Sequence, residues 1–109
     1  MAVLTITQAN FESEVLQSTQ PVLLDFWATW CGPCQRMGPV VEAIAARNPG
    51  LRVGKVNTDE QTALAVRMGI SSIPTLIVYR NGRELDRCVG LPANAQATLE
   101  DWLKGLGAL

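Results

Sequence analysis

Apolar and polar residues in the first quarter of the chain follow the period of a strand and then of a helix. Residues 3–7 alternate between the two types, and Asn10 is a plausible cap for a helix that reaches about Leu16. Residues 22–28 are apolar on both faces. Because a strand of this kind is buried on both sides, we expect it near the centre of a sheet.

The middle of the chain predicts two helices and the strand between them. Apolar residues recur at helical spacing over residues 32–48, up to an Asn-Pro-Gly breaker. Residues 51–57 predict a third strand. Thr58 and Gln61 have the spacing of a capping box, so we expect a helix to begin there and to end at Gly69.

The last third of the chain predicts a hairpin and a closing helix. Residues 75–80 and 84–89 are strand-like and flank Asn81-Gly82, a dipeptide that favours the tight turn between antiparallel strands. After Pro92, apolar residues recur at helical spacing and predict a stripe that covers one face of the sheet. The stripe comprises Leu99, Trp102, Leu103 and Leu106.

The resulting order of elements, βαβαβαββα, predicts an α/β fold. Right-handed crossovers place helices on both faces, which gives a central mixed five-stranded sheet flanked by four helices. The chain has 109 residues and no linker or repeat, so we expect a single domain over residues 1–109. Sites in such folds lie beyond the carboxyl ends of strands.

Composition and charge narrow the possible functions. Nine Lys and Arg against ten Asp and Glu give a net charge of −1, and the absence of a basic run argues against nucleic acid as a partner. The first twenty residues lack a basic start and a long apolar stretch, so we expect neither a signal peptide nor a membrane span, and a cytoplasmic protein. No glycine-rich phosphate loop follows a strand, so we expect no cofactor.

The chemistry is indicated by Trp30-Cys31-Gly32-Pro33-Cys34, which directly follows the central strand. Cysteines three apart on a first helical turn lie on one face and can form a reversible disulfide. The helix start favours the thiolate of Cys31, which is the predicted nucleophile, and Cys34 is placed to resolve the mixed disulfide. A structural disulfide or half of a zinc site are the alternatives, although three cysteines and no histidine do not complete a single-chain zinc site.

Asp25 is a carboxylate within the predicted central strand. Burial would raise its pKa, and below the cysteine pair it could accept the proton of Cys34, directly or through a water molecule. The alternative is an Asp at a strand end that reaches water or backbone N–H groups.

Several separated motifs make the chain resemble the thioredoxin family, most closely its bacterial type, along nearly the whole length. They are Asp25-Phe26-Trp27-Ala28, Trp30 to Cys34 with Pro39, Lys55-Val56-Asn57, Ile73-Pro74-Thr75, Asn81-Gly82 and Val89-Gly90. The resemblance implies a protein-disulfide reductase that is recharged by a thioredoxin reductase. It also implies that Asp25 takes the proton of Cys34 and that Lys55, on the neighbouring strand, is the partner of Asp25; a solvated strand lysine is the alternative for Lys55.

The resemblance further implies a substrate surface around the cysteines, with Pro74 as a cis proline that faces the disulfide. The surface comprises Trp30, Gly32, Pro33, Ile73, Pro74, Gly90 and Leu91. For Trp30, packing in the core is the alternative to shielding the disulfide. A small, weakly charged surface suits transient contact with many protein disulfides.

Two other points stay open at the level of sequence. Cys88 is either a buried, inert thiol or a regulatory thiol close to the substrate loop. A redox-independent binding module or subunit that uses the apolar surface around the motif is the alternative function. We expect a monomer.

Overall fold

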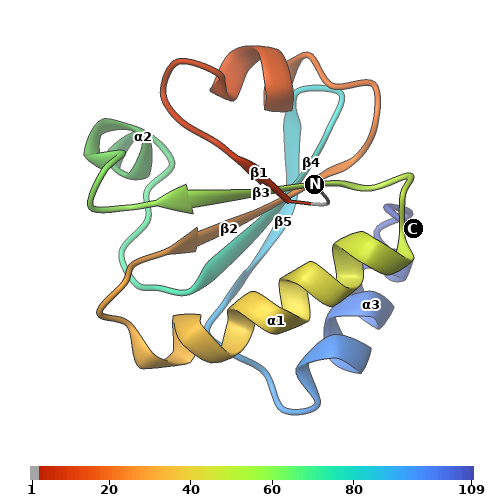
Figure 1. Cartoon of the computed structure of the whole chain (residues 1–109). Coiled ribbons are helices and arrows are strands. Elements are labelled where there is room, and N and C mark those ends of the chain that lie inside the picture. The colour runs from red at the N-terminus through yellow and green to blue at the C-terminus, as the bar shows by residue number, and fades with distance from the viewer. Residues whose placement is uncertain (1–2) are drawn as a thin grey trace.

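The computed structural model describes residues 3–109 and contains one five-stranded mixed sheet, with strand order β1-β3-β2-β4-β5 (Figure 1). β1 and β2 each pair in parallel with β3, whereas β4 pairs antiparallel with both β2 and β5. The predicted fold class is therefore confirmed. In chain order the elements are β1 (Val3–Thr5), η1 (Glu12–Leu16), β2 (Val22–Trp27), α1 (Gly32–Arg47), β3 (Arg52–Asn57), α2 (Thr62–Arg67), β4 (Thr75–Arg80), β5 (Arg83–Val89) and α3 (Ala95–Gly105).

β2 is the central strand, as its apolar residues predicted. It is buried over its first five residues and lies between β3 and β4. Alternation of side chains along β2 places Leu23 and Asp25 toward one face of the sheet and Leu24 and Phe26 toward the other. The carboxyl end of β2 leads directly into the loop that carries the cysteines.

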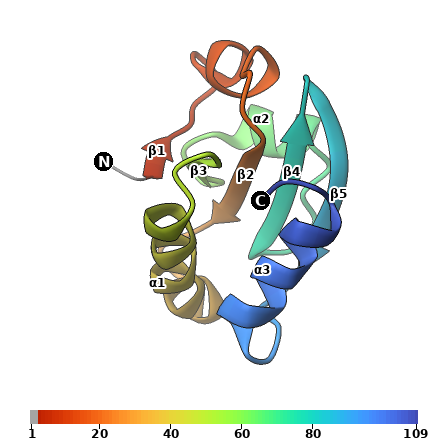
Figure 2. The same cartoon turned by 90° about the vertical axis from the view of Figure 1, so that its right-hand side faces the viewer.

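Helices cover both faces of the sheet (Figures 1 and 2). On one face, α1 and α3 lie side by side and pack on a cluster that includes Leu23, Val53 and Leu76; we call this the α1–α3 layer. On the other face, η1 and α2 pack on a cluster that includes Phe11 and Phe26; we call this the α2–η1 layer. The central strands β2 and β4 are therefore protected from water on each side, whereas β5 is largely exposed.

The hairpin between β4 and β5 has the turn that its sequence predicted. Asn81 and Gly82 have φ values of 53° and 76°, the left-handed pair that a two-residue hairpin turn requires. In the closing helix, Leu99 and Leu103 are buried, and Trp102 and Leu106 pack against the same layer. The predicted apolar stripe of α3 is thus confirmed.

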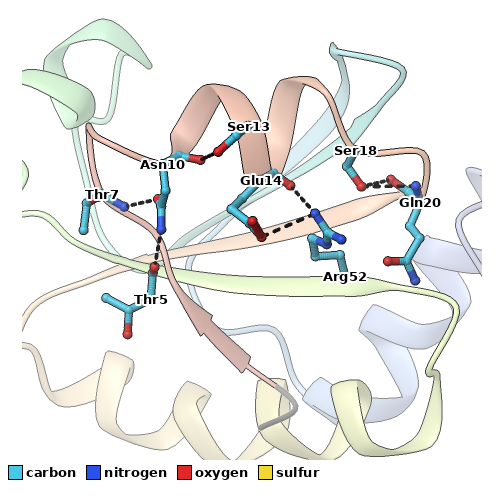
Figure 3. Close-up of polar contacts among 8 residues, drawn as sticks. All are labelled: Thr5, Thr7, Asn10, Ser13, Glu14, Ser18, Gln20 and Arg52. Carbon is cyan, nitrogen blue, oxygen red and sulfur yellow. Dashed lines mark hydrogen bonds and ion pairs between the residues drawn. The ribbon is translucent and has the colours of Figure 1, made fainter.

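The predicted role of Asn10 as a helix cap is wrong. Its side-chain oxygen accepts the backbone N–H of Thr7 at 2.7 Å, and its side-chain nitrogen donates to the carbonyl of Thr5 at 3.0 Å, so it closes the loop before the helix (Figure 3). The helix itself, η1, is a short π-helical segment. Arg52 of β3 donates to the backbone carbonyl of Glu14 at 3.0 Å and so ties η1 to the sheet (Figure 3).

The predicted capping box at Thr58 and Gln61 is also wrong. The hydroxyl of Thr58 donates to the carbonyl of Trp27 at 3.1 Å, and the side chain of Gln61 accepts the backbone N–H of Gln8 at 2.9 Å. The turn is closed instead by Asn57, whose side-chain oxygen accepts two backbone N–H groups from the turn. α2 therefore begins at Thr62, four residues after Thr58.

The two edges of the sheet are short or charged. β1 has three residues, and four residues of β5, Arg83, Glu84, Asp86 and Arg87, carry charges. Glu84 and Arg87 form an ion pair with an N···O distance of 2.7 Å. Among residues 3–109, no helix combines the length and the apolar character needed to cross a membrane.

Candidate active site

Cys31 and Cys34 form a disulfide at the start of α1, with a Cα–Cα distance of 5.2 Å. Cys31 is the N-cap residue of the helix and has extended backbone angles. Pro33 lies in the first turn, where a backbone N–H would have no partner within the helix, so the missing N–H of proline costs no hydrogen bond. The backbone N–H of Cys34 donates to Sγ of Cys31 at 3.2 Å. The helix start is thus aimed at the sulfur of the first cysteine, which favours negative charge there.

Little of the disulfide is exposed to solvent. Each cysteine has an exposed fraction of 4%, and the pair packs against Ala28, Trp27 and Ile73. Sγ of Cys31 lies 3.9 Å from the carbonyl oxygen of Ile73. Because a disulfide sulfur carries no proton, this contact is a hydrogen bond only in the dithiol form.

The zinc alternative gains no support from the surroundings of the cysteines. Within the part of the chain that the structure describes, no group of three or more Cys, His, Asp or Glu side chains is arranged to hold a metal ion. Structural zinc needs about four such ligands.

The Ile73-Pro74 peptide bond is cis, as the resemblance implied. Pro74 is buried, and its carbonyl accepts the backbone N–H of Gly90 at 2.8 Å, which joins the two loops beside the disulfide. Gly90 has a φ of 88°, a conformation that residues with a side chain rarely adopt. The structure therefore brings Ile73, Pro74 and Gly90 together where β4 begins and β5 ends.

The other residues of the predicted surface differ in exposure. Gly32 and Pro33 are exposed at the helix start, whereas Leu91 is half-buried and packs against the α1–α3 layer. Trp30 has an exposed fraction of 71%, so core packing is not its role. A hollow of about 410 Å³ lies between Trp30 and Ile73 and is also lined by Thr58, Ala65, Ile70, Ser71 and Ser72.

Asp59 is a neighbour of the site that the sequence analysis missed. The indole N–H of Trp30 donates to its carboxylate at 2.9 Å. The only signal in the sequence was the position of Asp59 in the turn after the Lys55-Val56-Asn57 motif, and Asn57 fixes that turn by accepting the N–H of Asp59. This hydrogen bond orients the exposed ring.

Asp25, on the strand that leads into the cysteine loop, has no exposed surface and no hydrogen bond to either carboxylate oxygen. The alternative of a solvated Asp at a strand end is therefore wrong. Burial raises the pKa of Asp25 from 3.8 to about 6, and the positive charge of Lys55 limits that rise. The carboxyl group can thus gain or lose a proton close to neutral pH.

Lys55 lies on β3, the strand next to β2, as predicted, and the register places it directly opposite Asp25. Its ammonium, however, lies over the ring of Trp27, 4.8 Å from the ring centroid. Among the ion pairs of residues 3–109 within 4.0 Å, none joins Lys55 to Asp25. Lys55 is therefore near Asp25 without being its direct partner.

The surroundings of Cys88 support its interpretation as an inert thiol better than its interpretation as a regulatory thiol. It is half-buried on β5 and packs against the α1–α3 layer. Burial, followed by the negative charge of Asp86, raises the pKa of its thiol. The thiolate that an oxidant attacks is thus disfavoured.

Comparison with known proteins gives consistent similarities over nearly the whole chain. The family model described as Thioredoxin matches residues 2–105. A thioredoxin of Porphyra purpurea is 44% identical over 104 residues, which cover 94% of this chain and 95% of the relative. Thioredoxin 1 of Synechococcus elongatus is 50% identical over 86 residues (78% and 80%), and a thioredoxin of Synechocystis is 46% identical over 101 residues (90% and 94%).

Proposed function

The chain belongs to the thioredoxin family and is a thiol:disulfide oxidoreductase of the protein-disulfide reductase class, and from this premise we propose the role of each site residue. Cys31 is the attacking thiol and Cys34 the resolving thiol. The observation that supports this order is the N–H of Cys34, which points at Sγ of Cys31 across 3.2 Å. A donor in that position stabilises the thiolate of Cys31 rather than that of Cys34.

The proposed cycle transfers two electrons from the dithiol to a substrate disulfide. The thiolate of Cys31 attacks one substrate sulfur, the substrate S–S bond breaks, and the other substrate sulfur leaves as a thiolate. Cys34 then loses its proton and attacks Sγ of Cys31, which releases the second substrate thiolate. The protein is left with the disulfide seen in the structure.

Asp25 is the proposed acceptor of the Cys34 proton, directly or through one water molecule. A pKa of about 6 makes it a competent base at neutral pH and a group that can return the proton when the disulfide is reduced again. Lys55, opposite Asp25, adjusts how readily that carboxyl group ionises.

The proposed substrate surface comprises Trp30, Gly32, Pro33, Ile73, Pro74, Gly90 and Leu91. Gly32 and Pro33 lie between the two cysteines and Ile73 packs against them, while the exposed ring of Trp30 and the hollow beside Ile73 offer apolar area. The surface residues named here carry no charge, which suits contact with many protein disulfides rather than one. Leu91 contributes less than the others, because it packs inward.

The family suggests protein disulfides as substrates. We further propose a thioredoxin reductase as the electron donor, a monomeric protein, one domain over residues 1–109 and a cytoplasmic location. These proposals are supported by the family membership, the weak net charge and the single sheet, whose strands extend from residue 3 to residue 89.

Trapping the intermediate tests the order of the two cysteines, with Cys88→Ser in every protein to remove the third thiol. Cys34→Ser should accumulate a mixed disulfide with a substrate such as insulin, visible by non-reducing electrophoresis and mass spectrometry. Cys31→Ser should accumulate far less. The reverse pattern would overturn the assignment, and full activity of the double Cys→Ser variant would favour the redox-independent binding module.

A further inference from the structure

The ammonium of Lys55 occupies a specific place beside the active site. It lies over the face of Trp27, 4.8 Å from the ring centroid, a distance at which an aromatic ring attracts a cation. α1 also comes close to the ammonium at Gly38, where an added Cβ would lie 3.7 Å from Nζ. The ammonium is therefore attracted by the ring of Trp27 and lies close to α1.

That position keeps the ammonium out of contact with Asp25. Both side chains project toward α1 from paired positions of β2 and β3, yet neither carboxylate oxygen of Asp25 has a hydrogen-bond partner. From β4, the residue opposite Asp25 is the neutral Leu76. The buried carboxyl group thus lacks the partner that its neighbour could provide.

Lys55 also has room to move. It lines a hollow of about 440 Å³ at the edge of the sheet, together with Trp27 of β2 and Thr5 of β1. The charged groups that face it there are Glu42 of α1 and Glu60 of the turn after β3. Without the ring of Trp27, a flexible lysine chain would be free to approach the unpaired carboxylate.

We propose that Trp27 is a positioning residue of the redox reaction: its ring holds the Lys55 ammonium away from an ion pair with Asp25 and so leaves that carboxyl group free to exchange a proton. An ion-paired Asp25 would stay ionised and would return the proton poorly. The proton moves from the S–H bond of Cys34 to a carboxylate oxygen, and the bonding electrons stay on sulfur. This inference rests on the proposed function of Asp25.

Trp27 also packs against the cysteines, so a substitution could act through packing alone. A lysine-free background separates the two effects, because a packing effect does not require Lys55. The readout is the titration midpoint of the Asp25 carboxyl carbon, followed by NMR in the oxidised protein with Cys88→Ser throughout.

Trp27→Leu should lower this midpoint by about 1 unit, since the released ammonium stabilises the carboxylate. Trp27→Phe keeps an aromatic face and should lower the midpoint less than Trp27→Leu does. Lys55→Met should raise it, and Trp27→Leu should then cause no further lowering. Trp102→Phe, a change at a remote tryptophan, is the control and should leave the midpoint unchanged.

Equal lowering by Trp27→Leu with and without Lys55 would overturn the inference. If the leucine variant does not fold, Trp27→Phe in both lysine backgrounds provides the same comparison. The pH profile of Cys34-dependent release of a chromogenic thiol from Cys31 is the second readout, and it should move with the NMR midpoint. An NMR shift that requires Lys55 but leaves this profile unchanged would retain Trp27 as the holder of Lys55 and would remove Asp25 from the proposed function.

Discussion

The two layers that cover the sheet differ in how they treat polar groups. In the α2–η1 layer the buried residues are apolar apart from two hydroxyl groups with partners: that of Tyr79 donates to the sulfur of Met68 at 2.8 Å, and that of Thr75 donates to the carbonyl of Ser72 at 2.6 Å. On the face covered by the α1–α3 layer, Asp25 is fully buried and neither of its carboxylate oxygens has a hydrogen-bond partner. One layer therefore serves mainly stability, whereas the other contains a buried carboxyl group that opposes stability and for which we propose a role in the proton transfer.

Truncating a large side chain in the α2–η1 layer should cause the largest loss of stability. Phe26→Ala removes a fully buried ring from the α2–η1 layer and should lower the free energy of unfolding by about 3–5 kcal/mol. Urea unfolding followed by circular dichroism measures this loss. The folded variant should still reduce disulfides at nearly the parent rate, and a specific loss of rate in the folded state would contradict the division between the layers.

Neutralising the buried carboxylate of Asp25 should have the opposite effect and raise the free energy of unfolding at pH 7. The folded pKa of Asp25, about 6, lies above its ordinary value of 3.8, so the cost of ionising it is absent below pH 3.8 and grows as the pH rises to 6. Asp25→Asn should therefore be more stable than the parent at pH 7 by about 3 kcal/mol, and the difference should vanish near pH 3.5.

Urea unfolding of both proteins at several pH values measures that difference. A gap that does not depend on pH would show that the substitution acts through packing and not through ionisation. The same variant should resolve mixed disulfides more slowly, which would separate stability from chemistry at a single residue.

Adding a methyl group at Gly54 probes how tightly the α2–η1 layer is filled. A Cβ there would lie 2.5 Å from Cγ1 of Ile6 and 3.1 Å from Cδ2 of Leu24. Gly54→Ala should lower the free energy of unfolding by about 1–3 kcal/mol. Gly50→Ala is the control, because nothing lies within 4 Å of its added Cβ; an equal loss there would contradict the steric explanation.

A methyl group added at Gly38, on α1 of the α1–α3 layer, should slightly increase the stability of the protein. The nearest atom to its Cβ is Nζ of Lys55 at 3.7 Å, an ordinary contact. Gly38→Ala should raise the free energy of unfolding by about 0.5–1 kcal/mol, because alanine loses less backbone entropy in a helix. Thermal unfolding measures it, and a loss of stability would indicate that the helix and Lys55 are already in tight contact.

The sequence predicted best those features that depend on residues close together along the chain. The central strand, the cysteine turn and the Asn81-Gly82 hairpin all follow from local pattern and backbone preference, and all are found in the structure. The caps at Asn10 and Thr58 were wrong because each side chain bonds to a carbonyl made available by tertiary packing or loop closure.

The active site, too, could be predicted only as far as local sequence patterns reach. The positions of Asp25 and Lys55 on paired strands could be predicted, but the choice of Lys55 between a carboxylate and an aromatic ring depends on side-chain conformation. The bond from Trp30 to Asp59 likewise joins residues 29 positions apart, through a turn that the sequence analysis attributed to a different cap.

The edges of the sheet bear on how this protein behaves at high concentration. An exposed strand edge can recruit a second chain and begin aggregation, and short or charged edges discourage such pairing. The three residues of β1 and the charges of β5 place both devices in one sheet. Two copies of the protein can meet through the apolar surface around the disulfide. Because both sheet edges resist the addition of a strand, we expect such contacts to separate and not to grow into a fibre at high concentration.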